Sequence, residues 1–217
     1  GCQLLESLHK KPAYDRIIVV AHSLGSVVAL DVLKQRWARR VDKFHDKDLS
    51  PLLKEVEDEA LKLHAIASAP DSSKEAVLQA RREFRAAQST YARELRNHAF
   101  EGNEGEEKSW RVSDFVTLGS PLTYAPFLLA DTDRDYRRRL AKFELPGCPP
   151  DLQILTEEMY LKGQDGDGLF VYRKSSASED GDHIVPRHGA MFSAMRWSNL
   201  YFATPGLVTG DMIAGEL

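Results

Sequence analysis

The sequence predicts an α/β protein with a mostly parallel sheet, and three observations lead to this fold class. Residues 17–21 form a continuous apolar run, as expected of a parallel strand that is covered on both faces. A sharp turn and an apolar helical segment follow that run directly. Two more strand-like segments, residues 112–118 and 196–202, come later in the chain. Strands that alternate with helices favour a parallel sheet, because parallel neighbours need a crossover connection.

The composition fits an ordinary globular protein and argues against several classes of function. The 217 residues are enough for one domain with a core, and 42% of them are hydrophobic. A net charge of −4 gives no electrostatic reason to expect a nucleic-acid partner or an anionic membrane. No run approaches the roughly 18 apolar residues of a transmembrane helix. Two cysteines, Cys2 and Cys148, are too few for a disulfide framework and favour a reducing, cytoplasmic compartment.

The first part of the chain is predicted to form a helix, a strand, a turn and a second helix. Residues 2–10 carry an apolar stripe at helical spacing and predict a short amphipathic helix. After the first strand, a buried helix is expected to end near Arg36. Its apolar side is formed by Val27, Val28, Leu30, Val32 and Leu33.

The second half of the chain offers less regular signals. The strand over 112–118 is expected to stop at Gly119-Ser120-Pro121, because glycine and proline interrupt a strand. A short helix over 122–130 and a basic, solvated stretch over 132–143 should follow. Residues 163–187 are rich in glycine and serine and predict loops ahead of the third strand.

Residues 40–108 are long, charged and helical, and they predict an antiparallel helical hairpin inserted between two elements of the core. The expected helices are 50–68 and 72–99, with Pro70-Asp71 between them and a capping box formed by Ser72 and Glu75. Apolar residues recur at the spacing of a coiled-coil seam, so Leu53, Val56 and Leu63 should face Val77, Phe84 and Tyr91. The insertion could be a lid, a docking surface or decoration. Seam residues that faced solvent would instead indicate a partner chain.

The segment Ala21-His22-Ser23-Leu24-Gly25 joins the first strand to the following helix and forms a nucleophile-elbow motif. A strand that turns sharply into a helix forces the serine into a strained backbone conformation and lifts its hydroxyl clear of the sheet. The positions two before and two after the serine approach each other there, so both must be small, as Ala21 and Gly25 are. The start of the helix favours an oxyanion, to which Leu24 would offer its backbone N–H. His22 should point away from Ser23.

Residues 14–28 resemble the elbow segment of lipase- and esterase-like α/β-hydrolases. Residues 114–122 are similar to the next strand in a bacterial branch of that superfamily, and 196–201 resemble the strand after it, leading to 210–215. The resemblance implies a three-layer α/β-hydrolase core, incomplete in this chain, as a single domain over 1–217 that carries the hairpin. It also implies a serine hydrolase that cleaves carboxylic esters of small molecules or lipids through an acyl-serine intermediate, without a metal or organic cofactor.

Two residues match the catalytic residues of these enzymes. Ser23 matches the nucleophile, and Asp211 matches the acid that orients the catalytic histidine, in the chain order of this fold. One imidazole has to bridge the two groups, so they should lie about 6–8 Å apart at the carboxyl edge of the sheet. Asp131, soon after the second strand, is the alternative acid. A surface turn without a catalytic role is the other interpretation of Asp211.

The catalytic histidine is missing from its expected place after Asp211. His183 and His188 precede the third strand, which is the wrong place for this fold, and His188 is kept only as a secondary candidate for the base. We therefore expect the base to lie outside this chain, as part of a longer enzyme. This chain on its own should be inactive. Only about 20 residues precede Ser23, so the second oxyanion donor, from a loop before the elbow, is also expected elsewhere.

Two other functions fit the same residues. A pseudo-hydrolase could use the helical hairpin as an interaction module, and an acyltransferase would use Ser23 with a different acyl acceptor. A fluorophosphonate probe separates the first of these from an active hydrolase, because labelling needs an activated serine. The sequence leaves the oligomeric state open. It contains no metal-ligand cluster, phosphate-binding loop or dinucleotide fingerprint, so we expect no metal or cofactor.

Overall fold

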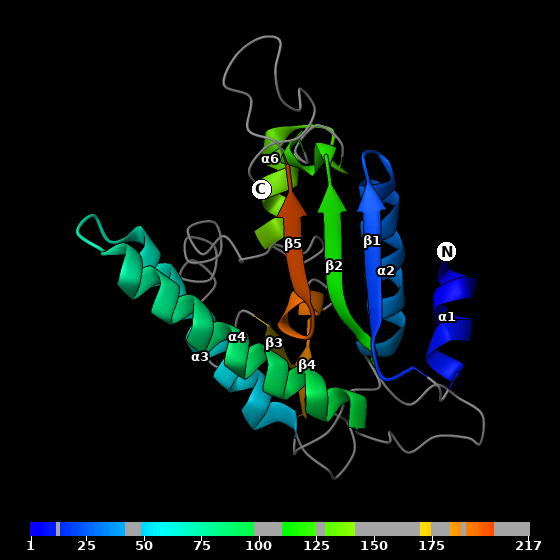
Figure 1. The fold of residues 1–217 in the computed structure, drawn as a ribbon, viewed down its shortest axis with the longest axis horizontal. Helices are drawn as coiled ribbons and strands as arrows, with labels where there is room; N and C mark the ends of the chain where they lie inside the picture. The colour runs from blue at the N-terminus through cyan, green and yellow to red at the C-terminus, as the bar shows by residue number, and fades with distance from the viewer. Residues whose placement is uncertain are drawn as a thin grey trace.

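A computed structural model describes residues 1–11, 14–41, 49–97, 110–124, 129–141, 170–174, 183–187 and 190–201. Its helices are α1 (Cys2–Lys10), α2 (Gly25–Val41), α3 (Leu49–Ser68), α4 (Lys74–Asn97) and α6 (Asp133–Ala141), with 3₁₀ turns η1 (Pro121–Tyr124) and η2 (Ala190–Ser193). Its strands are β1 (Ile17–His22), β2 (Val112–Leu118), β3 (Val171–Lys174), β4 (His183–Pro186) and β5 (Arg196–Leu200). The arrangement is of the mixed α/β kind and mostly helical (Figure 1). None of the described helices is long and apolar enough to cross a membrane.

The three predicted strands form one parallel sheet in the order β1-β2-β5. The register pairs Ala21 with Thr117 and Phe115 with Trp197, so all three strands point the same way and end at one edge (Figure 1). This result confirms a parallel sheet built from segments far apart in the sequence. The chain that leaves β1 therefore emerges beside the chain that leaves β2.

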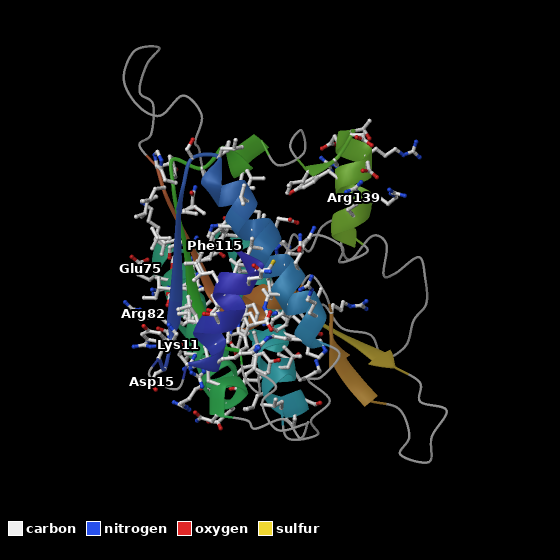
Figure 2. All side chains as sticks on the ribbon, turned by 90° about the vertical axis from the view of Figure 1, so that its right-hand side faces the viewer. Lys11, Asp15, Glu75, Arg82, Phe115 and Arg139 are labelled. Carbon is white, nitrogen blue, oxygen red and sulfur yellow. The ribbon has the colours of Figure 1, made fainter. Side chains whose placement is uncertain are left out.

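Strand β1 is more open than its apolar sequence suggests. Ile17 and Ala21 are buried, but the side chains of Ile18 and Val20 are 60% and 61% exposed. In Figure 2 the sheet is seen nearly edge-on, and α1 and α2 lie on the same side of it. The expectation that β1 is covered on both faces is therefore wrong for the described residues, and β1 is an edge strand of the three-stranded sheet.

Helix α2 starts where predicted but runs past Arg36 to Val41. Its buried side continues through Trp37, whose ring meets Trp110 edge-on with centroids 5.1 Å apart. The Trp37 Nε1–H donates to the Arg187 carbonyl at 2.9 Å. Val28 was expected on the apolar side and is instead exposed. The helix is longer than predicted because an aromatic contact one turn later keeps its buried face occupied.

The inserted hairpin is present as predicted. Helices α3 and α4 pack against each other, and the expected seam residues are buried, except for Val77, which is partly buried against the core. The cap of α4 is shifted by one residue: Ser73 Oγ accepts from the Ala76 N–H at 3.1 Å, while Ser72 Oγ donates to the Ile66 carbonyl at the end of α3. The predicted Ser72 and Glu75 capping box is therefore wrong. Both serines still serve the turn, one for each helix.

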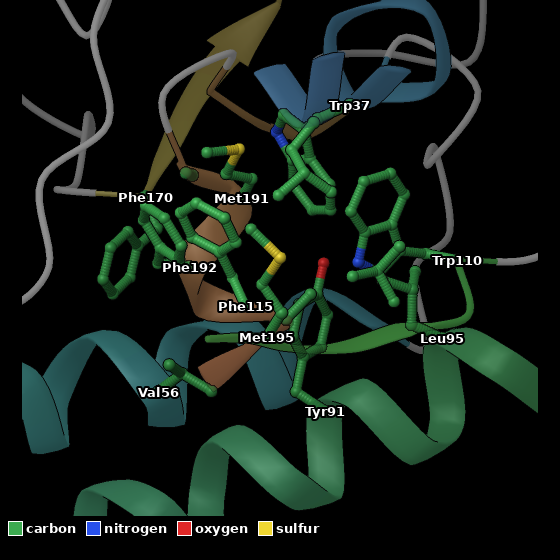
Figure 3. Packing of buried hydrophobic residues seen from close by; sticks show 14 of the residues in the cluster. Trp37, Val56, Tyr91, Leu95, Trp110, Phe115, Phe170, Met191, Phe192 and Met195 are labelled. Carbon is green, nitrogen blue, oxygen red and sulfur yellow. The ribbon is translucent and has the colours of Figure 1, made fainter. Parts of the chain in front are cut away.

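The hairpin shares one hydrophobic core with the sheet. Figure 3 shows Tyr91 of α4 close to Met195, and Leu95 of the same helix close to Trp110, and all of them are buried. Burial raises the pKa of the Tyr91 phenol, which therefore stays protonated. The core thus joins the insertion to the sheet by direct packing.

The hairpin approaches the sheet from the end opposite to the carboxyl edge. The end of α4 lies below the start of β2 in Figure 1. Burial, followed by the nearby charge of Arg16, lowers the pKa of the Arg96 guanidinium, so this part of α4 lies close to the chain entering β1. This geometry gives no support to a lid over Ser23.

Three later segments differ from their predictions. Residues 163–187 were expected to be loops, yet β3 and β4 pair as a two-stranded antiparallel sheet with Val171 opposite Pro186. The basic stretch over 132–143 contains helix α6, on which Asp133 and Arg137 form an ion pair four residues apart at 2.9 Å. The short helix expected over 122–130 appears as η1; residues 125–128 lie outside the described ranges.

A substitution at Gln88 tests how the hairpin is held. The buried Gln88 Nε2 donates to the carbonyls of Phe192 and Met195, at 2.6 and 3.0 Å. Gln88→Met keeps the volume but leaves both carbonyls without this donor, so we expect the free energy of unfolding to fall by about 1–3 kcal/mol in urea titrations. Gln79→Met, an exposed control on the same helix, should change it by less than about 0.5 kcal/mol. Equal losses would contradict this account of docking.

Candidate active site at the turn after strand β1

Ser23 follows β1 directly and has a left-handed backbone, with φ of 51°. It is the one non-glycine residue with positive φ among those the structure describes. This conformation costs an L-residue roughly 1–2 kcal/mol, so it is rare outside glycine. The predicted outlier at the strand-to-helix turn is therefore confirmed.

Hydrogen bonds on both sides of Ser23 explain the conformation. Its N–H donates to the Leu118 carbonyl at 2.9 Å, which extends the parallel ladder one residue beyond β1. Its carbonyl accepts from the Ser26 N–H at 2.9 Å, which begins the first turn of α2. The backbone must therefore change from strand to helix at this single residue.

The turn after β2 has the same construction. Gly119 follows β2 directly, has φ of 54°, and donates its N–H to the Leu200 carbonyl of β5 at 3.0 Å. Ser23 follows β1 and donates to Leu118 of β2 in the same way. The chain thus uses glycine, which adopts positive φ without strain, at one turn and serine at the other.

The small-residue requirement around Ser23 is met only in part. Ala21 is buried, as a close approach would demand. A Cβ placed on Gly25, however, would have nothing within 4 Å. The expectation that Gly25 must be small for steric reasons is wrong here, because the first turn of α2 is exposed at this position.

Two buried serines, Ser26 and Ser120, lie beneath the elbow, and their contact with each other was not predicted. The Ser26 Oγ donates to the Ser23 carbonyl at 2.6 Å and lies 2.6 Å from Ser120 Oγ. Both side chains have 0% exposure. Ser120 follows Gly119, so the turn after β2 contacts the elbow through this pair. The available signal was a serine next to the glycine that stops β2, which had been interpreted only as a strand terminator.

The carboxyl ends of β2 and β5 are also linked by side chains. Thr117 Oγ1 donates to Asn199 Oδ1 at 2.7 Å and accepts from the Trp197 Nε1–H at 3.1 Å. Thr117 is fully buried. These contacts fix the point at which the chain leaves β5 toward residues 202–217, which lie outside the described ranges.

The backbone N–H groups at the start of α2 are available to a ligand. Neither the Leu24 nor the Gly25 N–H donates to an acceptor within the described part of the chain. First-turn amides have no partner within their helix, and together with the helix dipole they favour an anion. The predicted oxyanion donor, the Leu24 N–H, belongs to the residue that follows Ser23 and has no acceptor among the described residues. The second oxyanion donor, expected from a loop before the elbow, stays a prediction.

The described histidines do not supply a base for Ser23. His22 is exposed, and no hydrogen bond joins it to Ser23 in the described structure. His9 is buried, with ring nitrogens 2.7 Å from the Leu5 carbonyl and 3.2 Å from the Arg111 N–H. His64 belongs to the hairpin.

Of the two later histidine candidates, only the backbone of His183 is described. The backbone of His183 belongs to β4, which lies toward the opposite end of the sheet from Ser23 (Figure 1). His188 lies outside the described residues.

The two candidate acids are not both placed. Asp211 lies outside the described residues, so its predicted position at the carboxyl edge stays a prediction. Asp131 is exposed and lies two residues before α6. Strand β5, which precedes Asp211, ends at the same edge as β1.

Comparisons with protein-family models, with curated proteins and with solved structures found no match for this chain. The chemistry of the site is therefore inferred from its own geometry. Among the described residues, no group of three or more side chains is arranged to hold a metal ion. What the site does offer is a half-buried Ser23 followed by the exposed residues Leu24 and Gly25, whose N–H groups have no acceptor among the described residues.

Replacing Ser23 by glycine tests the strain. Glycine adopts positive φ freely, so Ser23→Gly should raise the free energy of unfolding by about 1 kcal/mol, less than the full left-handed penalty because glycine also gains freedom when unfolded. The control is Ser89→Gly, an exposed site within α4, where the same change should lower stability by about 1 kcal/mol. Losses at both positions would show that Ser23 is not strained.

Proposed function

We propose that this protein is a serine hydrolase of the α/β-hydrolase kind that cleaves carboxylic esters of small molecules or lipids. The observation that carries the proposal is the left-handed conformation of Ser23 at the end of a parallel strand. The equivalent turn after β2 has glycine in that conformation, so the fold needs the conformation but does not need a serine. A strained residue that the fold could replace by glycine is best explained by the chemistry of its side chain.

The roles follow from the groups around the turn. Ser23 Oγ attacks the ester carbonyl carbon while a histidine takes its proton, and the oxygen that becomes negative is bound by the Leu24 N–H. The histidine then protonates the departing alcohol, leaving an acyl-serine. Water, deprotonated by the same histidine, releases the carboxylic acid and restores the serine. No metal or organic cofactor takes part in this scheme.

The base and the acid come from outside the described residues in this proposal. No hydrogen bond joins Ser23 to His9, His22 or His64 in the described structure, so we assign the base to a histidine outside the described residues. Asp211 is the proposed acid, because the chain leaves β5 on the edge that carries Ser23. Asp131 is the alternative acid, because it comes soon after β2, which ends at the same edge of the sheet.

Labelling with a fluorophosphonate tests the proposal directly. In the full-length protein, we expect covalent labelling at Ser23, located by peptide mass spectrometry, because only an activated serine attacks this probe rapidly. Ser23→Ala should abolish labelling, and the exposed control Ser89→Ala should not change it. A folded protein that leaves the probe intact would favour a pseudo-hydrolase. Labelling combined with transfer of the acyl group to an acceptor other than water would favour an acyltransferase.

Substitution of the two aspartates identifies the acid. Loss of the carboxylate that orients the histidine typically lowers kcat by roughly 10³–10⁴-fold, so Asp211→Asn should have an effect of that size on ester hydrolysis. Asp131→Asn should leave kcat within about twofold, as is usual for an exposed side chain away from the chemistry. The reverse pattern would move the acid to Asp131.

A further inference from the structure

The buried hydroxyls of Ser26 and Ser120 form a hydrogen-bond chain whose direction is fixed. A hydroxyl has one proton, and Ser26 donates its proton to the Ser23 carbonyl at 2.6 Å, because a carbonyl can only accept. The contact of 2.6 Å between the hydroxyls must therefore be a donation from Ser120 to Ser26. Ser120 Oγ itself accepts from the Leu122 N–H at 3.2 Å. The chain thus runs from the backbone of η1 to the carbonyl of the nucleophile.

This chain fixes more than a carbonyl, because the Ser23 carbonyl and the Leu24 N–H belong to one peptide group. In a trans peptide the C=O and N–H bonds are coplanar and point in opposite directions. The Ser23 carbonyl is held toward Ser26 by both the N–H, at 2.9 Å, and the hydroxyl of that residue. The Leu24 N–H must then point away from Ser26.

We infer that Ser120 is a positioning residue for the oxyanion donor of the proposed hydrolase. Through Ser26, it sets the rotation of the peptide between Ser23 and Leu24 and so aims the Leu24 N–H at the reacting carbonyl. The inference rests on the proposed function and adds a residue remote in sequence to that site. Ser120 does not touch substrate, since its side chain has 0% exposure.

The strained backbone explains why such a hold is needed. A left-handed serine has an unfavourable backbone conformation, and the adjoining peptide could relieve it by rotating. The first turn of α2 holds this peptide only at its carbonyl, through the Ser26 N–H, because the Leu24 N–H donates to no described acceptor. The hydrogen bonds from Ser120 to Ser26 and from Ser26 to the Ser23 carbonyl oppose this rotation, and consecutive hydrogen bonds strengthen one another.

The kinetic test compares Ser120→Ala with a matched control. Ser193 is also fully buried, and its Oγ donates at 2.7 Å to the carbonyl three residues earlier, as Ser26 does. In the full-length protein, Ser120→Ala should lower kcat for ester hydrolysis on the order of tenfold with KM within about twofold, less than the roughly 10²–10³-fold loss on removing an oxyanion donor. Ser193→Ala should leave kcat unchanged. Equal kcat values for both variants would overturn the inference.

Two more variants separate positioning from loss of stability. Ser26→Ala removes the direct donor to the Ser23 carbonyl and should slow kcat at least as much as Ser120→Ala does. The double variant should be no slower than Ser26→Ala, because both side chains act through one hydrogen bond. If the double variant instead lowered kcat by the product of the two single effects, the two serines would not act through one hydrogen-bond chain. Ser120→Cys, which keeps a weak donor, should recover part of the rate.

A measurement without substrate tests the same geometry. The sequence has Ser–Leu steps at Ser7–Leu8 and Ser23–Leu24, so labelling Ser carbonyl carbons with ¹³C and Leu nitrogens with ¹⁵N selects these two amides from this segment. Ser120→Ala should shift the Leu24 amide resonance and leave that of Leu8 in place, while Ser193→Ala should move neither. An unmoved Leu24 resonance would overturn the inference even if Ser23 proves inert. Failure of fluorophosphonate labelling alone would instead refute the proposed function.

Discussion

The hydrogen bond from the Ser23 N–H to the Leu118 carbonyl is the interaction on which the rest of the site depends. It continues the ladder between β1 and β2 by one residue past the end of β1. The backbone that leaves β1 therefore turns at a point that the register of the two strands determines. Gly119 repeats the arrangement between β2 and β5. Two successive strand ends are therefore tied to their neighbours at one edge. The elbow, the turn after β2 and the exit from β5 are placed by the same backbone pairing.

A second constraint acts at the other end of the sheet, where the helical insertion and the sheet share one core. Phe192 of η2 stacks on Trp197 of β5 with ring centroids 5.0 Å apart, and the carbonyl of Phe192 accepts from Gln88 of α4. The 3₁₀ turn is thus the link between hairpin and sheet. Because its residues are fully buried, the hairpin and the sheet should unfold together rather than as independent units.

Much of the fold could be predicted from the sequence, because its strongest signals are periodic. The hairpin, the three parallel strands and the turn at Ser23 all have local patterns that determine their conformation. The length of α2 could not be predicted, because it depends on Trp37 meeting Trp110, more than 70 residues away. The pairing of β3 with β4 was also missed, because neither strand shows the alternation of apolar and polar residues that indicates a strand.

The candidate site was predicted only where local geometry defines it. Ser23 and Leu24 follow from the turn itself. The Ser26–Ser120 contact joins positions 94 residues apart and depends on the strand order, which no local pattern encodes. The exposed face at Ile18 and Val20 could not be predicted either. An apolar run shows that a strand can be buried, but it does not show which other part of the chain covers each face.

The turn between α3 and α4 has a practical consequence for handling the molecule. Ala69, Pro70 and Asp71 are exposed, and the hairpin joins the sheet through the opposite end of α4. Short exposed turns accept inserted sequence more readily than any other part of a domain. A fluorophore or an affinity peptide placed between Pro70 and Asp71 would extend outward from a rigid arm. Such an attachment would immobilise the protein on a surface with the edge that carries Ser23 left accessible.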